Sequence, residues 1–332
     1  MSEEKKFRWV GTRPVRPDGI DKVTGRANYG ADFALPDMRW GRVLRSPHAH
    51  ARVVSIDASK ALELEGVHAV ISAEDFPDLF SEQAAKSGGH NESNDLAHNV
   101  MARGRVLYHG HPVAAVAATS SALAARALEL IEGEYETMPH VLGIEAALAP
   151  GAPLIHEDRV PQDMEDPEPS NIAKRVQLGH GDLDEGFAQA DEIIEREFST
   201  RPVHQGYIEP HACLARSGPD GRTTIWCSSQ GHFMVRDYTA KLLGMDLSLI
   251  QVIPAEIGGG FGGKTTVYLE PLAVLLSRKS GRPVKMVMSR EEVFRASGPT
   301  LGTRIKLKLG ARSDGTFTAG EATLHYLSLI HI

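Results

Sequence analysis

The chain of 332 residues contains only two cysteines, Cys213 and Cys227, and has no C-x-x-C pair. By any familiar pattern it therefore carries no ligand set for an iron–sulfur cluster of its own. Both cysteines lie in apolar, strand-like segments. This context favours two small buried side chains over a disulfide or a pair of metal ligands.

An excess of positive charge is also missing, as is any long apolar run. The 36 basic residues are outnumbered by 43 acidic ones, and the net charge of −7 argues against a general nucleic-acid-binding protein. No apolar run is long enough to cross a bilayer, and the polar N-terminus lacks the features of a secretory signal. We therefore expect a cytoplasmic protein.

What is present is the composition of a globular protein with room for two domains. Hydrophobic residues make up 42% of the chain and charged residues 24%. Prolines and acidic residues cluster between residues 149 and 170, which is typical of a linker. We place the domain boundary in this segment.

Periodicity predicts a mixture of strands and helices on both sides of the linker. In the first half we expect strands at residues 40–46, 53–56, 67–71 and 112–118, helices at 59–64 and 121–132, and a surface loop at 80–99. In the second half we expect strands at 193–198, 213–216, 223–228, 249–253 and 284–288, helices at 234–242 and 269–276, and a hairpin that turns at 312–315.

The most unusual segment is residues 258–265, GGGFGGKT, which we call the glycine loop. It lies between a predicted strand and a predicted helix. Because glycine has no Cβ, such a loop can expose successive backbone N–H groups and let a bulky anion approach the main chain. Two kinds of ligand use this arrangement: a nucleotide phosphate, and the pyrophosphate and metal end of a large cofactor.

A nucleotide-binding P-loop is the first alternative. The loop fits the pattern G-x-x-x-x-G-K-[ST], with Lys264 and Thr265 at its end, and its strand–loop–helix context is suitable. A P-loop protein also needs a second apolar strand that ends in an aspartate for Mg²⁺. The strand predicted at 284–288 is followed by Ser-Arg-Glu-Glu instead, and a phosphate cradle has no need for the bulky Phe261.

Two further segments carry polar groups that could line a cleft. Residues 204–211, HQGYIEPH, place Glu209 before a proline that keeps it extended. Considered alone, these groups are better explained as surface or hydrogen-bonded side chains. Residues 226–232, WCSSQGH, contain Gln230, whose neutral amide can donate to an oxo group and accept from a hydroxyl. An ordinary helix-capping turn explains this second segment equally well.

In this order, the three segments resemble the molybdopterin-binding large subunit of the xanthine dehydrogenase and aldehyde oxidase family, which includes carbon monoxide dehydrogenase. Residues 21–27 (DKVTGRA), 45–51 (RSPHAHA) and 110–114 (GHPVA) resemble the α/β hammerhead domain of that family. The resemblance covers about residues 12–326. It implies an α+β fold with these parts: an extended lead-in at 1–19, a hammerhead domain at 20–146, a linker at 147–178, and the N-terminal part of the molybdenum cofactor-binding domain at 179–326.

The last six residues, 327–332, do not continue the hairpin pattern. They resemble the translation of a transposon adapter used in sequencing libraries. We expect a non-native tail here and a natural gene that continues beyond it.

The resemblance implies a molybdenum–pterin cofactor, which bacteria usually extend with cytosine dinucleotide. Gln230 matches the glutamine that hydrogen-bonds an oxygen on the metal, and Phe261 lies in the loop whose backbone amides meet that oxygen and the pterin. The full set of expected cofactor-binding residues is Gln230, Gly231, Gly260, Phe261, Gly262 and Gly263, with Gln230 and Phe261 nearest the metal. Preorganised N–H dipoles stabilise the negative charge that such an oxygen gains when the metal is reduced.

The implied reaction is oxidative hydroxylation of an aldehyde, an N-heterocycle or a related small substrate. Because no cluster motif is present, the resemblance implies that electrons pass to a separate small [2Fe–2S] subunit and a medium FAD subunit. The implied full-length assembly is a dimer of heterotrimers.

One departure from the family bears on the substrate. Members that hydroxylate xanthine carry a glutamate directly after the lysine of the loop, where this chain has Thr265. Thr265 and Glu209 are the candidate substrate contacts, and xanthine itself is the doubtful substrate.

The general-base glutamate of the family and its arginine-bearing loop lie beyond this chain, so we expect no catalytic residue within it. We also expect the chain alone to bind no molybdenum cofactor and to show no turnover; stoichiometric molybdenum in the purified chain would contradict this. A non-catalytic scaffold of the same fold is the second alternative. The intact Gln230 and glycine loop argue against it, because neither is needed for packing.

Overall fold

The computed structural model describes residues 7–77, 92–157, 161 and 168–327. The fold is mixed α/β, as the sequence predicts. Nearly the whole tail expected to be non-native lies outside the described residues. In the described ranges, no helix combines the length and apolarity that crossing a bilayer requires.

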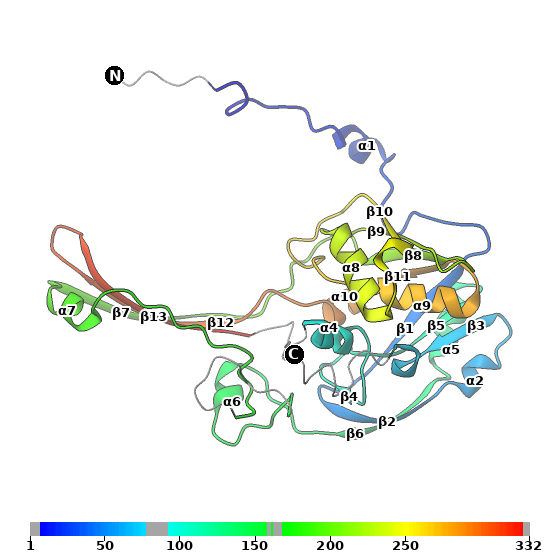
Figure 1. Cartoon of the computed structure of the whole chain (residues 1–332), viewed down its shortest axis with the longest axis horizontal. Coiled ribbons are helices and arrows are strands. Elements are labelled where there is room, and N and C mark those ends of the chain that lie inside the picture. Colours follow the sequence, from blue (N-terminus) through cyan, green and yellow to red (C-terminus); the bar gives the residue numbers. More distant parts are fainter. Residues whose placement is uncertain (1–6, 78–91, 158–160, 162–167, 328–332) are drawn as a thin grey trace.

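A seven-stranded mixed sheet forms the centre of the body (Figure 1). Its strands, in spatial order, are β10 (Ile250–Pro254), β9 (Thr223–Cys227), β8 (Ala212–Ser217), β11 (Val284–Val287), β1 (Arg39–Arg45), β5 (Pro112–Ala118) and β3 (Val67–Ile71). β1 pairs in parallel with β11, so strands from both sides of the predicted linker share one sheet. The domain boundary itself stays a prediction from sequence.

The strand β5 shows how the sequence builds this core. Its residues are continuously apolar, and all seven are buried. Ala115 and Ala117 pack into the cluster that includes α9 (Glu270–Ser280), whereas Ala114 and Val116 pack into the cluster that includes α5 (Ser121–Leu128). A strand covered on both faces needs apolar residues at every position, which explains the uninterrupted run.

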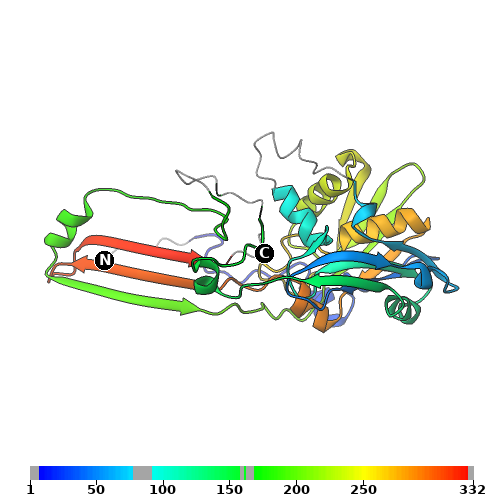
Figure 2. The same cartoon turned by 90° about the horizontal axis from the view of Figure 1, so that it is seen from below.

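Two smaller sheets complete the strand inventory of the described residues. One contains β4 (Arg105–Val106), β2 (Ala51–Asp57) and β6 (Glu132–Thr137), and the other contains β13 (Phe317–Tyr326), β12 (Thr303–Ala311) and β7 (Glu192–Thr200). The β12–β13 hairpin confirms the predicted turn at 312–315. The sheet of β7, β12 and β13 extends away from the body as a long arm (Figure 2).

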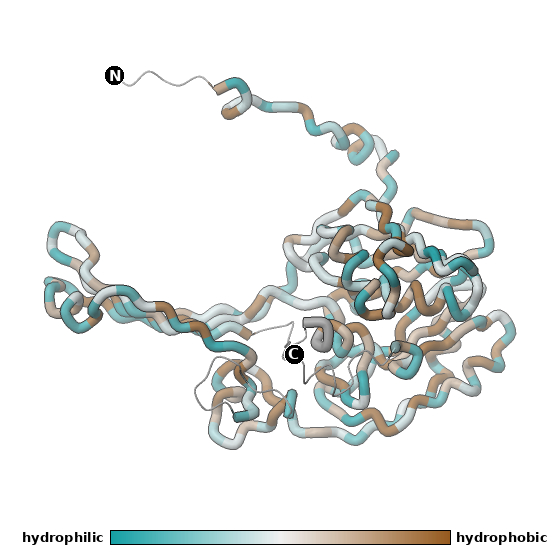
Figure 3. Tube along the Cα trace, viewed as in Figure 1, coloured by the Kyte–Doolittle hydropathy of each residue, from teal (hydrophilic) through white to brown (hydrophobic). Residues whose placement is uncertain are grey.

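The helices are short, and several of them pack against the large sheet. Besides α5 and α9 they are α1 (Gly19–Thr24), α2 (Ser59–Leu62), α4 (Glu92–Val100), α6 (Ile144–Leu148), α7 (Leu183–Ala188), α8 (His232–Leu243) and α10 (Arg290–Ala296), with 3₁₀ turns at Ala73–Asp75 and Leu247–Leu249. Apolar segments concentrate in the body, while the N-terminal segment and the arm alternate between polar and apolar residues (Figure 3).

Three sequence predictions need correction. The predicted surface loop at 80–99 is wrong for residues 92–99, which belong to α4, and residues 80–91 lie outside the described residues. The helix predicted over 121–132 ends at Leu128, and β6 begins at Glu132. No strand was expected there because β6 is exposed and polar, so it carries no apolar pattern. Ser120 caps the start of this helix, since its Oγ accepts from Leu123 N at 3.1 Å.

A buried histidine lies at the start of β5. His111 Nδ1 accepts from Leu107 N at 3.1 Å, so the ring proton is on Nε2, which donates to the carbonyl of His98. The neutral imidazole therefore uses both of its nitrogens. Burial lowers the pKa of His111 to about 3.

We predict that His111 makes the fold sensitive to acid. Its pKa is 6.5 when exposed and about 3 when folded, so between these values the unfolded state binds one more proton. The stabilisation is complete above pH 6.5 and is lost as the pH falls toward 3, by about 1.4 kcal/mol per pH unit. Urea unfolding between pH 7 and pH 4 measures this slope. The His111→Gln variant lacks this titrating group, so its unfolding free energy should depend on pH less steeply, by the contribution of one proton. Identical slopes in the two proteins would contradict the prediction.

Candidate functional site

The glycine loop and Gln230 meet at one edge of the large sheet. β9 and β10 are parallel neighbours, and Pro254 at the end of β10 pairs with Cys227 at the end of β9. Gln230 follows β9 by three residues and the loop follows β10 by four. In open sheets with parallel strands, ligands bind outside the carboxyl ends of those strands. The predicted cofactor-binding residues are therefore together at the position where such sheets hold ligands.

The side chain of Gln230 is hydrogen-bonded to the loop. Its Oε1 accepts from Gly262 N at 2.9 Å and from Lys264 N at 3.2 Å. Its own backbone N donates to the carbonyl of Lys264 at 3.0 Å. Because Oε1 must be the acceptor for two N–H groups, the orientation of the amide is fixed. Nε2 then remains as a donor that the loop does not use.

Gly260 lies in close contact with this amide. A Cβ added at Gly260 would lie 2.5 Å from Gln230 Oε1, so a side chain fits there only if the Gln230 amide moves. The glycine at this position is therefore explained by the approach of Gln230. Within the described residues, the backbone N–H groups of Gly260 and Phe261 have no hydrogen-bond partner.

Phe261 is held in an unusual backbone conformation. Its φ is 52°, in the left-handed region that bulky residues rarely adopt. Its side chain is 74% exposed, so core packing is not what holds it there. Such outliers persist only where the surrounding structure over-determines them, and they cluster at active sites and ligand sites. This observation motivates a ligand-facing role for Phe261.

The remaining predicted cofactor residues use their amides inside the protein. Gly263 N donates to the carbonyl of Gly260 at 2.7 Å, which closes a tight turn. Gly231 N donates to Ser229 Oγ at 3.1 Å, directly before α8. Both residues therefore shape the site from within, and the free donors belong to Gln230, Gly260 and Phe261.

Glu209 lies behind the loop and faces the protein interior. Its Oε2 accepts from Gly258 N and from Lys264 Nζ, both at 2.7 Å, and its Oε1 accepts from Gly30 N at 3.2 Å. The side chain of Lys264 is 1% exposed and that of Glu209 is 9% exposed. Both carboxylate oxygens are thus bonded within the chain, so the geometry favours an anchoring role for Glu209 over the predicted substrate contact.

The loop rests on a buried polar network. Tyr207 Oη lies 2.7 Å from His211 Nε2 and 2.9 Å from Ser297 Oγ. Burial lowers the pKa of His211 to about 3, so this histidine is neutral near pH 7. A Cβ at Gly263 would lie 2.6 Å from the Tyr207 ring, which shows how closely the loop packs on it.

The environment of Lys264 does not favour the P-loop alternative. Its ammonium is buried against Glu209, and burial lowers the pKa of Lys264 despite the nearby carboxylate. Thr265 Oγ1 donates to the carbonyl of Gly262 at 2.8 Å, and α9 begins only at Glu270. A P-loop lysine reaches phosphates and its Ser/Thr hydroxyl reaches Mg²⁺, with the helix N-terminus beside them. Here neither side chain is available in that way.

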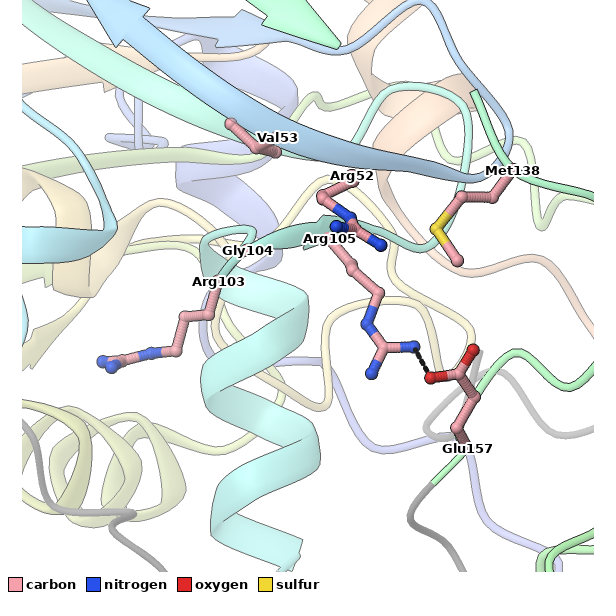
Figure 4. A pocket seen from close by; sticks show the side chains of 7 residues that line it. All are labelled: Arg52, Val53, Arg103, Gly104, Arg105, Met138 and Glu157. Atoms are coloured by element: carbon pink, nitrogen blue, oxygen red, sulfur yellow. Dashed lines mark ion pairs between the residues drawn. The ribbon is translucent and has the colours of Figure 1, made fainter. Parts of the chain in front are cut away.

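A separate pocket lies on the sheet of β2, β4 and β6, away from the predicted site residues (Figure 4). Its volume is about 420 Å³, and it is lined by Arg52, Val53, Arg103, Gly104, Arg105, Met138 and Glu157. Arg105 pairs with Glu157 at 3.2 Å, and Arg52 pairs with Glu136 at 3.5 Å. These carboxylates offset two of the arginine charges, so the pocket is not a strong anion site.

Sequence patterns assigned no role to three residues that shape the site: Gly30, Tyr207 and Ser229. Tyr207 lies in the HQGYIEPH segment, where its aromatic ring between polar residues was the available signal. Ser229 accepts from Gly231 N and lies beside Gln230. Gly30 is 179 residues from Glu209 in the chain, so no local pattern could have found that contact.

The comparisons with known proteins decide the family. Residues 24–139 match the aldehyde oxidase and xanthine dehydrogenase a/b hammerhead domain, and residues 164–327 match the molybdopterin cofactor-binding domain. The nicotinate dehydrogenase large molybdopterin subunit of Eubacterium barkeri is 32% identical over 322 residues, which cover 96% of this chain and 71% of that protein. The chain belongs to the family of molybdopterin-binding large subunits of xanthine dehydrogenase and aldehyde oxidase. The resemblance drawn from the motifs is confirmed.

Other members of this family are similar over most of the chain. The xanthine dehydrogenase molybdenum-binding subunit of Escherichia coli O157:H7 is 34% identical, over 91% of this chain and 39% of that protein. The crystal structure of quinoline 2-oxidoreductase from Pseudomonas putida 86 matches with a TM-score of 0.80 and 30% identity, over 95% of this chain and 39% of that one. CO dehydrogenase from Oligotropha carboxidovorans matches with the same TM-score and coverage at 31% identity. The chain thus spans about 39% of the length of these three relatives.

We predict that Gly260→Ala disconnects Gln230 from the loop without unfolding the chain. Gly260 does not have a positive φ, so its backbone accepts alanine, but the new Cβ must displace the flexible Gln230 amide. Gly262 N and Lys264 N then lose their acceptor, and their hydrogen exchange should accelerate by about two- to tenfold, as expected for the loss of one hydrogen bond. Amide exchange followed by NMR measures this.

The matched control is Gly179→Ala, whose Cβ would meet no atom within 4 Å. It should leave the exchange of both loop amides unchanged. Equal protection of Gly262 and Lys264 in wild type and Gly260→Ala would show that the contact with Gln230 does not hold the loop.

Proposed function

We propose that this chain forms the hammerhead part and the first cofactor-binding part of a molybdenum hydroxylase large subunit. The proposed reaction is oxidative hydroxylation of an aldehyde, an N-heterocycle or a related small molecule. One observation supports it most: the amide of Gln230 is fixed through its oxygen to the glycine loop, and its NH₂ group is left as a donor.

The donors of this site fit the oxygen ligands of a molybdenum–pterin group. Gln230 Nε2 and the N–H groups of Gly260 and Phe261 are neutral donors that no described protein group uses. The absence of a Cβ at Gly260 makes room for the Gln230 amide beside the loop. When bound, the cofactor supplies the two-electron oxidation, while these residues hold and orient its oxygens. We propose the cytosine dinucleotide form of the pterin.

Protein side chains alone offer no complete metal site here. Within the described ranges, no group of three or more His, Cys, Asp or Glu residues is placed to hold a metal ion. A pterin that brings its own sulfur ligands fits such surroundings, because the protein then needs to supply only hydrogen bonds. We therefore assign Gln230 and Phe261 to the neighbourhood of the metal as hydrogen-bond donors and not as its ligands.

We propose that electrons leave through partner subunits, a small one with [2Fe–2S] clusters and a medium one with FAD, in a dimer of heterotrimers. The arm supports partner binding. On one face of its sheet, the large side chains of Ile194, Phe198, Leu324 and Tyr326 are between 47% and 57% exposed. An uncovered apolar sheet face of this kind marks an interaction surface.

The proposed substrate is smaller or less polar than xanthine. Thr265 stands where xanthine-hydroxylating members carry a glutamate. Its hydroxyl donates to the carbonyl of Gly262, so toward a substrate it can offer only an acceptor lone pair. That arrangement suits a single N–H or O–H donor on a heterocycle or a related small molecule. Glu209 has no role in this proposal as a substrate contact.

We propose the cytoplasm as the location. Cys213 and Cys227 are directly opposite each other on β8 and β9, yet both are free and buried. Buried, unpaired thiols that are adjacent in this way are typical of proteins from a reducing compartment.

The test is the metal and cofactor content of the chain isolated from its host with the subunits that it binds. We predict molybdenum and a pterin at equal amounts in the wild-type complex, together with iron and flavin from the partners. Gln230→Ala should weaken the affinity for the cofactor about tenfold or more and so lower the molybdenum occupancy, because a charge-assisted hydrogen bond contributes about 1.5–3 kcal/mol. Elemental analysis and chromatography of the oxidised pterin provide the measurement.

Gln251→Ala is the matched control, since Gln251 is an exposed glutamine on the neighbouring β10. It should leave the molybdenum content unchanged. An intact wild-type complex without molybdenum would overturn the proposal and favour the scaffold. Tight binding of Mg·ATP that Lys264→Ala abolishes would favour the P-loop alternative instead.

A further inference from the structure

A single carboxylate joins the two ends of the glycine loop. Gly258 opens the loop and Lys264 lies near its end, six positions later. The backbone N–H of Gly258 and the ammonium of Lys264 both lie 2.7 Å from Glu209 Oε2. The distance between the two ends of the loop is therefore set by one atom.

The same carboxylate also reaches the N-terminal part of the chain. Glu209 Oε1 accepts from Gly30 N at 3.2 Å, and a Cβ at Gly258 would lie 2.6 Å from Glu209 Cβ. The carboxylate is thus oriented by bonds to both of its oxygens, and the loop packs directly on its side chain. The Glu209 side chain and the glycine loop therefore have little conformational freedom.

Burial of this ion pair carries a large desolvation free energy, so the pair contributes little net stability. The side chains of Lys264 and Glu209 are 1% and 9% exposed, so both charges have lost most of their hydration. Apolar residues of similar volume often serve stability as well as a buried pair or better. The buried Glu209–Lys264 pair is therefore better explained by the loop conformation that it specifies, since each charge is compensated only when it lies beside the other.

Hydrogen bonds from the main chain of Lys264 connect this ion pair to Gln230. The N–H of Lys264 donates to Gln230 Oε1 at 3.2 Å, and its carbonyl accepts from Gln230 N at 3.0 Å and from Ser229 Oγ at 3.2 Å. When Glu209 holds the side chain of Lys264, it also fixes the backbone that orients the Gln230 amide. The contacts run without a gap from Glu209 to the free NH₂ group of Gln230.

We propose that the Glu209–Lys264 ion pair is a positioning device for the glycine loop, which sets the direction in which Gln230 and Phe261 present their donors. Glu209 and Lys264 are positioning residues that touch neither cofactor nor substrate. The identity of the ligand that the loop holds rests on the proposed function. The order of the loop itself can be measured in the chain without any cofactor.

The experiment places 4-fluorophenylalanine at position 261 and records the ¹⁹F resonance of the chain. Lys264→Met and Glu209→Gln should each shift and broaden this resonance, and the amide exchange of Gly262 should accelerate at least tenfold. The control is Glu292→Gln. Glu292 pairs with Arg45 at 3.0 Å and also accepts from a backbone N–H, but it lies on α10 outside the loop. This variant should lower the unfolding free energy and leave the ¹⁹F resonance unchanged.

The double variant Glu209→Gln/Lys264→Met separates positioning from stability. It leaves no unpaired buried charge, so urea unfolding should show a higher stability than in either single variant. The ¹⁹F resonance should stay broad because the ion pair is absent. A wild-type resonance in the double variant would overturn the proposal, and so would single variants that lose stability without any change at Phe261.

The cofactor content of the host complex tells the two proposals apart. A disordered Phe261 in the variants, with no molybdenum in the wild-type complex, leaves the positioning role intact and removes the proposed function. Molybdenum in the wild-type complex, with an unchanged ¹⁹F resonance in the variants, removes the positioning role alone.

Discussion

The site depends on the buried contact between Lys264 and Glu209. A lysine that is 1% exposed needs a compensating charge, and among its described contacts this carboxylate provides it. The position of Lys264 then decides where the glycine loop runs, and the main-chain bonds of Lys264 decide how Gln230 is oriented. A loop with five glycines has high conformational entropy when free. The ion pair and the Gln230 bonds are what offset that entropy in the folded chain.

The large sheet brings these groups to the same place. β1 pairs with β11, so the hammerhead part and the cofactor-binding part share one core and cannot move as independent bodies at that seam. The Arg45–Glu292 ion pair crosses the same seam at 3.0 Å. Gly30, from the N-terminal part, reaches Glu209 behind the loop. The glycine loop is therefore supported from both halves of the chain.

The sequence predicts features that neighbouring residues encode, but not contacts between residues far apart in the chain. The glycine loop stands out because a glycine-rich turn after a strand has a short-range signal, and the buried run of β5 is visible for the same reason. Gln230 is singled out only through the resemblance to the family. The anchoring role of Glu209 could not be predicted, because its partners Lys264 and Gly30 are 55 and 179 residues away in the chain. The polar strand β6 was missed because an exposed strand has no apolar alternation to detect.

The chemistry of the donors explains why this loop suits a redox centre better than a nucleotide. A phosphate carries a fixed negative charge and is best met by a cation at the loop, yet the only lysine of the loop turns inward to Glu209. The donors that no described protein group uses are the neutral dipoles of Gln230, Gly260 and Phe261. An oxygen ligand whose charge changes during turnover needs partners that stabilise the reduced state without trapping it. Fixed N–H dipoles meet this requirement, because their attraction grows with the charge on the oxygen and needs no rearrangement of the protein.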